Sequence, residues 1–172
     1  MNGKVQKSLR KSGDAMIYHK QIVYSLEALG YLASRPNNKH VNVKELAEEL
    51  HIPRHFLGKV LTELVKRELV TSTKGPSGGF RLAVNAESTS LYRILAVLGG
   101  LTKLESTCIM GTGACKANDP CALHELWLEF REKAVSKTQK LTLEEFSQTF
   151  TNKLPSVNAE LRQHKGSSIS YD

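Results

Sequence analysis

The hydrophobic period of this chain changes from helical to strand-like near residue 69, and this change limits its possible folds more than any other feature. Upstream, apolar residues recur at the spacing of an amphipathic helix in three consecutive segments. The sequence therefore predicts three helices, over about 17–34, 43–50 and 53–67. The break between the last two is the dipeptide His51-Ile52, which is short enough to hold two helices at a steep angle.

Downstream of residue 69 the pattern is that of a β-hairpin. Residues 69–73 are rich in β-branched side chains, residues 75–79 form the turn cluster Gly-Pro-Ser-Gly-Gly, and residues 80–83 can return as a partner strand. Helix, short helix, tight break, helix and hairpin form the element order of a winged helix-turn-helix. The sequence thus predicts a mainly α fold with one small β-hairpin.

The second half is predicted to be helical on both sides of one irregular loop. A Thr-Ser pair at 89–90 can cap a fourth helix, which a Gly-Gly pair at 99–100 stops. After the loop, apolar residues at helical spacing mark a long amphipathic helix, about 122–138. Thr142 and Glu145 have the spacing of a capping box, which predicts a last short helix.

The net charge of +7 lies entirely in the first half of the chain. Residues 1–82 carry 14 Lys and Arg against 7 Asp and Glu, whereas residues 83–172 carry ten of each kind. This asymmetry predicts one half that binds a polyanion and another with a different task. A membrane partner would need a basic amphipathic helix with exposed aromatic residues, and none is visible. No apolar run approaches the ~20 residues of a transmembrane helix and no signal peptide is recognisable, so a cytoplasmic protein is expected.

The third helix and the hairpin supply the residues expected to contact DNA. In a helix-turn-helix the N-terminal end of the recognition helix faces base edges in the major groove, and here that end carries Arg54, His55 and Lys59. The hairpin offers cations and hydroxyls to the minor groove and to phosphates, and its glycines leave the approach unobstructed. Its candidate contacts are Ser72, Thr73, Lys74, Ser77 and Arg81.

Three residues near these contacts need a separate explanation. Gly58 lies in the middle of the third helix, where glycine costs about 1 kcal/mol relative to alanine. It would make sense if the backbone there comes close to DNA or to a neighbouring helix. Phe56 and Phe80 are predicted to lie in the core or to anchor the hairpin rather than to stack on bases. Basic helix faces and Gly-rich turns are usually plain solvated surface, and neither feature alone indicates DNA binding. The order of the elements and the confinement of the excess positive charge to the first half together favour DNA binding.

Three cysteines and one histidine form a candidate metal site. Cys108, Cys115 and Cys121 are all the cysteines of the chain, and His124 follows three residues after the last. Three thiolates and an imidazole suit a structural Zn²⁺ site, and they also suit an iron–sulfur cluster with mixed ligation. The alternative is three buried, unreactive thiols, but the polar flanks and the confinement to one loop favour a metal. The spacings of six and five residues lean weakly towards a cluster.

Several short stretches of the chain match one known family when they are taken together. They are Val-Lys-Glu-Leu-Ala at 43–47, Phe-Leu-Gly-Lys-Val-Leu at 56–61, Leu-Val at 69–70, Lys-Gly-Pro-Ser-Gly-Gly-Phe at 74–80 and the Cys/Cys/Cys/His loop. Over about residues 16–150 the chain resembles the IscR/NsrR family of bacterial iron–sulfur transcription regulators. The resemblance implies a homodimer joined by the long helix, a roughly palindromic operator in double-stranded DNA, and a cluster that alters operator affinity.

The resemblance also implies the ligands of the cluster. The cysteine ligands correspond to Cys108, Cys115 and Cys121, and the histidine ligand of the [2Fe-2S] members corresponds to His124. Members that sense nitric oxide with a [4Fe-4S] cluster take a ligand from an aspartate early in the first helix, where this chain has Val23. This favours [2Fe-2S] over [4Fe-4S], with Zn as the alternative. The first cysteine gap departs from the family pattern, since it is six residues where five is common.

The expected protein is a DNA-binding transcriptional regulator and not an enzyme. We expect a repressor whose cluster senses redox, nitric oxide or iron status and thereby sets operator affinity. The alternatives are a regulator with a structural zinc site and a cluster-carrying redox protein with an acidic protein partner. The chain divides into a disordered extension (1–15), a winged helix-turn-helix domain (16–100), a cluster-binding loop (101–121), a dimerisation helix with a short helix (122–152) and a flexible tail (153–172).

Overall fold

The computed structural model describes residues 20–101, 104, 107–110, 118 and 120–151 of the chain. The predicted extension at 1–15 and tail at 153–172 lie outside this part. In chain order the elements are α1 (Lys20–Ala33), the 3-10 turn η2 (Pro36–Asn38), α2 (Val43–Leu50), α3 (Arg54–Lys66), β1 (Val70–Thr73), β2 (Gly79–Leu82), α4 (Leu91–Val97), α6 (His124–Lys140) and α7 (Leu143–Thr151). The predicted mainly α fold with a single hairpin is confirmed for the described residues.

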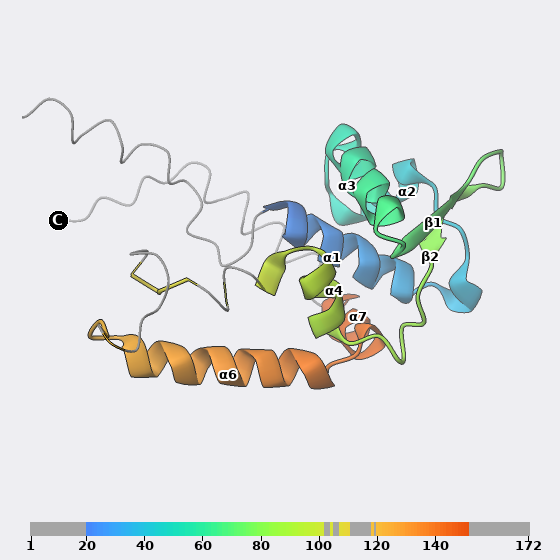
Figure 1. Ribbon diagram of the computed structural model, residues 1–172. Coiled ribbons are helices and arrows are strands. Elements are labelled where there is room, and N and C mark those ends of the chain that lie inside the picture. Colours follow the sequence, from blue (N-terminus) through green and yellow to red (C-terminus); the bar gives the residue numbers. More distant parts are fainter. Residues whose placement is uncertain (1–19, 102–103, 105–106, 111–117, 119, 152–172) are drawn as a thin grey trace, which may run out of the picture.

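The first three helices pack around one apolar core (Figure 1). Each helix buries the stripe of residues that its helical period predicts, and Leu29 of α1, Leu46 of α2 and Leu57 of α3 are completely buried. α7 packs against the opposite side of α1, although it comes from the far end of the chain. The core is therefore closed by a helix from the second half of the sequence.

Local backbone chemistry makes the break between α2 and α3. The Asn42 side chain caps α2 by accepting a hydrogen bond from the Glu45 amide at 2.9 Å. His51 ends α2 in the left-handed conformation, with φ 54°, and its amide donates back to the carbonyls of the last turn. Pro53 was predicted to form the first turn of α3, but its ψ of 129° is not helical, and α3 begins one residue later, at Arg54.

The hairpin is held to the rest of the fold at its base. β1 and β2 are antiparallel, with Val70 opposite Leu82 and Thr73 opposite Gly79. Val41 pairs with the hairpin through an isolated antiparallel bridge, because it exchanges two backbone hydrogen bonds with Phe80, at 2.9 and 2.8 Å. The Asn38 side chain extends this pairing by donating to the Leu82 carbonyl and accepting from the Leu82 amide, both at 3.0 Å. The wing therefore has a fixed base and a free tip.

The second half joins the first through α4 and α7. Ser90 caps α4, as predicted, since its hydroxyl accepts a hydrogen bond from the Arg93 amide. The predicted capping box also forms: Glu145 accepts from the Thr142 amide at 2.9 Å, and the Thr142 hydroxyl accepts from the Glu145 amide at 3.2 Å. α4 ends before Gly99, whose φ is +74°, and Leu101 is again helical.

α6 packs along α4 and projects beyond it (Figure 1). Trp127 of α6 packs against a second, smaller apolar cluster, whose fully buried members include Leu95, Leu101 and Leu104. No residue of α6 itself is buried in the chain. Among the described residues, no helix combines the length and the apolar character that a membrane crossing requires.

Candidate nucleic-acid interface and metal site

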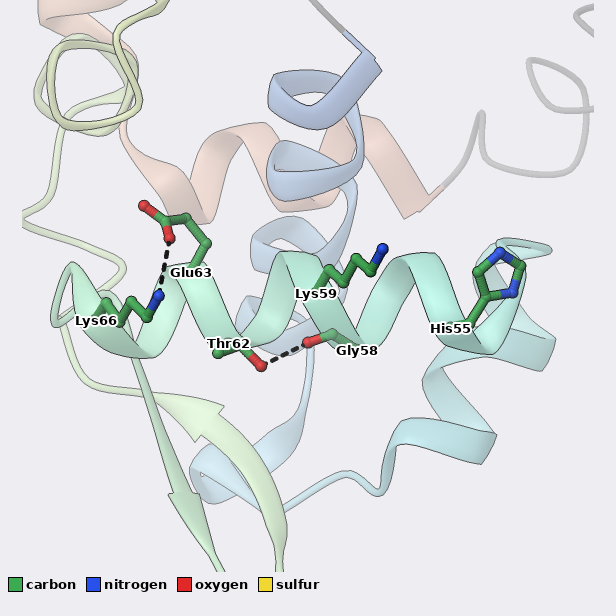
Figure 2. A pocket seen from close by; sticks show the side chains of 6 residues that line it. All are labelled: His55, Gly58, Lys59, Thr62, Glu63 and Lys66. Carbon is green, nitrogen blue, oxygen red and sulfur yellow. Dashed lines mark hydrogen bonds and ion pairs between the residues drawn. The ribbon is translucent and has the colours of Figure 1, made fainter.

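The outward face of α3 is a shallow, open hollow with a volume of about 500 Å³ (Figure 2). Its lining residues recur along one side of the helix: His55, Gly58, Lys59, Thr62, Glu63 and Lys66. The acid among them, Glu63, is shared between Lys66 at 3.8 Å and Arg67 at 2.9 Å. Its charge is therefore offset, and the face as a whole is cationic.

The residues predicted to contact DNA are all exposed. On α3 they lie in the first two turns, and on the wing they lie on both strands and at the tip. In the described part of the chain, none of the four cationic members forms an ion pair with a carboxylate. The eight residues are Arg54, His55, Lys59, Ser72, Thr73, Lys74, Ser77 and Arg81.

Close backbone contacts shape the wing tip. Gly75 has φ +111°, and its carbonyl accepts a hydrogen bond from the Gly78 amide at 3.0 Å. A Cβ on Gly78 would lie 2.1 Å from the Thr73 carbonyl oxygen, and a Cβ on Gly79 would lie 2.5 Å from that of Val41. Glycine at these positions allows two strands to approach more closely than any side chain would permit.

The wing also contacts the segment before α2 through a side chain. The Thr73 hydroxyl lies 3.1 Å from Nε2 of His40. His40 is half-buried. Together with the pairing of Val41 and Phe80, this contact orients the end of β1 that is nearer the wing tip.

Gly58 has open space where its side chain would be. No atom of the described residues lies within 4 Å of a Cβ built on it, although the Thr62 hydroxyl donates to its carbonyl at 2.8 Å. The sequence offered two reasons for this glycine, and the structure removes one of them, since no described neighbouring helix approaches it. Close approach of DNA at Gly58 stays a prediction.

The prediction for Phe56 was wrong. Phe56 is 50% exposed in the first turn of α3, and its ring lies against that of His55, with centroids 4.4 Å apart and planes tilted by 41°. The helical period puts Phe56 at the edge of the apolar stripe, where packing decides between core and surface. Phe80, in contrast, packs against the main core as predicted.

Arg67 connects α3 to α4, a link that the sequence did not reveal. Its Nε donates to Oε1 of Glu63 at 2.9 Å, and its guanidinium also donates to the carbonyl of Val97, the last residue of α4. A cation is favourable at this end of a helix because the last carbonyls are unsatisfied. The contact joins residues 30 positions apart, so no local pattern could predict it.

The structure brings two of the predicted metal ligands together. The sulfur atoms of Cys108 and Cys121 lie 3.6 Å apart, and Cys108 is buried whereas Cys121 is half-buried. Cys115 lies outside the described residues. His124 begins α6, and its amide donates to the Cys121 carbonyl at 3.0 Å.

The complete set of four ligands stays a prediction. Within the described residues, no group of three or more His, Cys, Asp and Glu side chains is arranged to hold a metal ion. The 3.6 Å separation nevertheless fits the chemistry of a shared metal, because two thiolates bound at 2.3 Å to one tetrahedral ion lie about 3.8 Å apart.

Trp127 ties the start of the cysteine loop to α6. Its indole Nε1–H donates to the carbonyl of Thr107, next to Cys108, at 2.9 Å, and its ring stacks on Phe130. The sequence predicted Trp127 only as part of an amphipathic stripe. Its hydrogen bond places the loop beside the apolar cluster that contains α4 residues.

Glu27 is a buried acid in the middle of α1. It is 2% exposed, and its Oε2 has no hydrogen-bond partner among the residues that the structure describes. Desolvation by burial raises the pKa of Glu27 from 4.5 to about 7. Sequence reasoning missed this burial, because a charged side chain in a helix is expected to face solvent.

Comparison with known proteins identifies a family and several relatives. The Rrf2 family, described as "Iron-dependent Transcriptional regulator", matches residues 18–149. A protein of Aquifex aeolicus described as an HTH-type transcriptional regulator is 38% identical over 120 residues, which cover 69% of this chain and 82% of that protein. The HTH-type transcriptional regulator IscR of Klebsiella pneumoniae is 25% identical over 142 residues, which cover 83% of each chain.

Solved structures show the same fold at lower identity. CymR of B. subtilis, titled the global cysteine regulator, has a TM-score of 0.64 and 21% identity, and the match covers 77% of this chain and 96% of that one. IscR of T. potens has a TM-score of 0.57 and 16% identity, and the match covers 91% and 96% of the two chains.

Proposed function

The chain belongs to the Rrf2 family of transcriptional regulators, and from that premise we propose that it is a homodimeric repressor whose operator affinity depends on an iron–sulfur cluster. The observation that carries the proposal is the exposed cationic face of α3 beside a wing with a fixed base. Such a regulator acts on chromosomal DNA and therefore works in the cytoplasm. The family consists of regulators, which argues against the cluster-carrier alternative.

In this proposal α3 enters the major groove and the wing reaches the minor groove. Arg54, His55 and Lys59 contact base edges and phosphates from α3. Lys74 and Arg81 supply cations on the wing, and hydroxyl groups there donate to phosphates. The wing hydroxyls are those of Ser72, Thr73 and Ser77.

The exposed apolar side of α6 supports dimer formation. Leu126 and Phe130 share one face of α6 and are 62% and 45% exposed, and Leu123, just before the helix, is 39% exposed; this is unfavourable for a long helix that faces only water. A second copy of α6 would cover such a surface. The dimer would then present two α3 helices to a roughly palindromic operator, whose half-sites lie one helical turn or a multiple of it apart.

Cys108, Cys115, Cys121 and His124 are the proposed ligands of the cluster. When bound, an iron–sulfur cluster supplies a centre that reacts with oxidants and nitric oxide and is lost in iron starvation. The 3.6 Å spacing of Cys108 and Cys121 supports two thiolates on one metal ion. We propose [2Fe-2S], because Val23 cannot serve as the fourth ligand that an aspartate provides in [4Fe-4S] members.

A continuous set of contacts supports coupling between the cysteine loop and α3. Thr107, beside Cys108, accepts the hydrogen bond of Trp127, and Trp127 packs on the cluster that contains Leu95 of α4. The end of α4 is bound by Arg67, which also binds Glu63 of α3. Ordering of the loop can thus move the end of α4 and the outward face of α3 together.

The first test is the metal content of protein purified without oxygen. Iron and sulfide at about two of each per chain, with a charge-transfer spectrum, support the [2Fe-2S] proposal. Zinc without sulfide contradicts it and leaves a regulator with a structural site, for which the same sulfur spacing is suitable. Cys108→Ala is expected to lose the metal, whereas Met110→Ala, exposed on the same loop, is the matched control and should retain it.

The second test compares operator binding with and without the cluster. DNA selected from a random pool should bind with an affinity that falls steeply between 50 and 200 mM salt, by about 1,000-fold or more if six or more phosphates are contacted. Wild type and Cys108→Ala should differ in affinity. Equal affinities would contradict the sensing role, and Arg67→Met should reduce the difference if the coupling contacts act as proposed.

A further inference from the structure

We infer that Phe56 determines sequence specificity by contacting the C5-methyl group of a thymine in the operator. The inference rests on the proposed DNA-binding function and deepens it. It assigns a base-reading role to an apolar residue, where the sequence predicted only polar and cationic contacts.

The first argument is exposure at a position where exposure is unfavourable. Phe56 is 50% exposed, whereas Leu57, the next residue of the same helix, is completely buried. The core below α3 is filled by Leu57, Val60, Leu61 and Leu64, so Phe56 is not needed to close it. A large apolar side chain that stands free on a cationic face is a candidate for contact with a partner.

The second argument is that Phe56 is held in place. Its ring contacts the ring of His55, with centroids 4.4 Å apart, and His55 lines the hollow on the outward face of α3. Successive helical residues point about 100° apart, so Phe56 lies on the flank of the hollow, beside His55. The two rings form one aromatic edge in the first turn of α3.

The third argument is chemical. A phenyl ring neither donates nor accepts a conventional hydrogen bond, so Phe56 cannot bind a phosphate as Arg54 or Lys59 can. In the major groove, the thymine C5-methyl is the apolar group that base pairs present, and cytosine lacks it. The N-terminal end of α3 is the part that would face base edges, and the Gly58 surface beyond it is open. Phe56 is therefore suited to distinguish T·A from C·G.

The test uses a duplex selected from a random pool by the full-length protein. Each thymine is replaced in turn by deoxyuridine, which removes only the methyl group. One thymine per half-site should be sensitive, with binding about fourfold weaker, the factor expected for withdrawing one methyl group from an apolar contact. Other thymines in the same duplex are the internal controls.

The protein variants then assign that sensitivity. Phe56→Ala should bind thymine and deoxyuridine at the sensitive position equally, whereas Phe56→Leu should retain part of the difference because it remains apolar. Far-UV circular dichroism and the thermal midpoint of both variants should match wild type, since the residue is half exposed. Sensitivity that is the same in wild type and Phe56→Ala would overturn the inference, as would its absence from wild type.

Failure of the inference can be told apart from failure of the proposed function. If no duplex is bound in a salt-dependent way, DNA binding itself is contradicted, and the inference falls with it. If a duplex is bound but Phe56→Ala leaves the deoxyuridine pattern unchanged, only the role of Phe56 is overturned. Loss of the pattern in Phe56→Ala, with salt-dependent binding retained, supports both.

Discussion

α3 and α6 have similar sequence patterns but make opposite use of them. Both carry leucines and aromatic residues at helical spacing. α3 buries four of its apolar side chains in the core of its own chain, whereas α6 buries none. On α6, Leu126 is 62% exposed, and on α3, Leu61 is completely buried. An amphipathic stripe therefore shows that a helix needs a partner surface, and it does not show whether that surface is in the same chain.

The two helices also differ in what they leave exposed. α3 presents a glycine, lysines and a ring pair above a filled core, and these suit a polar ligand. α6 presents apolar side chains, which suit a second protein surface. We therefore expect substitutions in α3 to affect the folding of one chain or DNA binding, and substitutions on the outer side of α6 to affect self-association.

The largest expected effect comes from truncating one leucine side chain to alanine in each helix. Leu61→Ala should lower the free energy of unfolding by between about 2 and 5 kcal/mol, because it leaves a cavity at a completely buried position. Leu126→Ala removes the same atoms and should change the unfolding of dilute, monomeric protein by less than about 0.5 kcal/mol. Urea titration measures the free energy of unfolding of both variants, and sedimentation at several protein concentrations measures self-association. A cost for Leu126→Ala equal to that for Leu61→Ala would mean that α6 is buried within its own chain.

The next effect concerns the carboxyl group of Glu27, whose burial in α1 is unfavourable when it is ionised. The raised pKa of Glu27, about 7 against 4.5, means that the folded state binds a proton more tightly than the unfolded state. Stability should therefore fall as the pH rises from 4.5 to 7 and remain low above that. Glu27→Gln should be more stable than wild type by up to about 3 kcal/mol at pH 8, and most of this gain should be lost near pH 4.5.

Urea unfolding at both pH values measures this difference. Glu87→Gln is the matched control for the substitution itself, because Glu87 is exposed. An equal gain for Glu27→Gln at pH 4.5 and pH 8 would show that folding does not raise the pKa of Glu27.

A third prediction separates the base of the wing from its tip. Gly79→Ala should destabilise the protein by about 2 kcal/mol, because φ is +148° and the new Cβ would clash with the Val41 carbonyl. Gly75→Ala has a similar backbone strain, with φ +111°, but finds open space, so it should cost less. Urea titration compares the two, and hydrogen exchange at the Val41 and Phe80 amides reports on the base. Equal costs would mean that strain, and not the contact with Val41, requires glycine at position 79.

The smallest effect is on the outward face of α3, where stability and binding should move in opposite directions. Gly58→Ala should stabilise the protein by about 1 kcal/mol, because alanine is the better helix former and its Cβ meets no described atom. If DNA approaches the backbone there, the same change should weaken operator binding by about fivefold, equivalent to about 1 kcal/mol. Thermal unfolding and a binding titration measure the two. Greater stability with unchanged affinity would remove Gly58 from the interface.

The capping motifs could be predicted because their signals are local. The Ser90 cap and the Thr142–Glu145 capping box each depend on residues at most three positions apart, and both form. The exposure of the basic residues on α3 and the wing follows from the same periodicity. Phe56 was predicted wrongly because a residue at the edge of an apolar stripe has no local signal that decides between core and surface.

The sequence by itself determined the order of the elements, the location of the charge and the residue types of the candidate metal site. Tertiary structure alone decided that α7 closes the core over α1, that Arg67 binds the end of α4, and that Trp127 binds Thr107. It also decided that Glu27 is buried and that the thiols of Cys108 and Cys121 meet. The physical reason is range: caps, turns and periodicity act within a few residues, whereas these contacts join distant segments and depend on how whole helices pack.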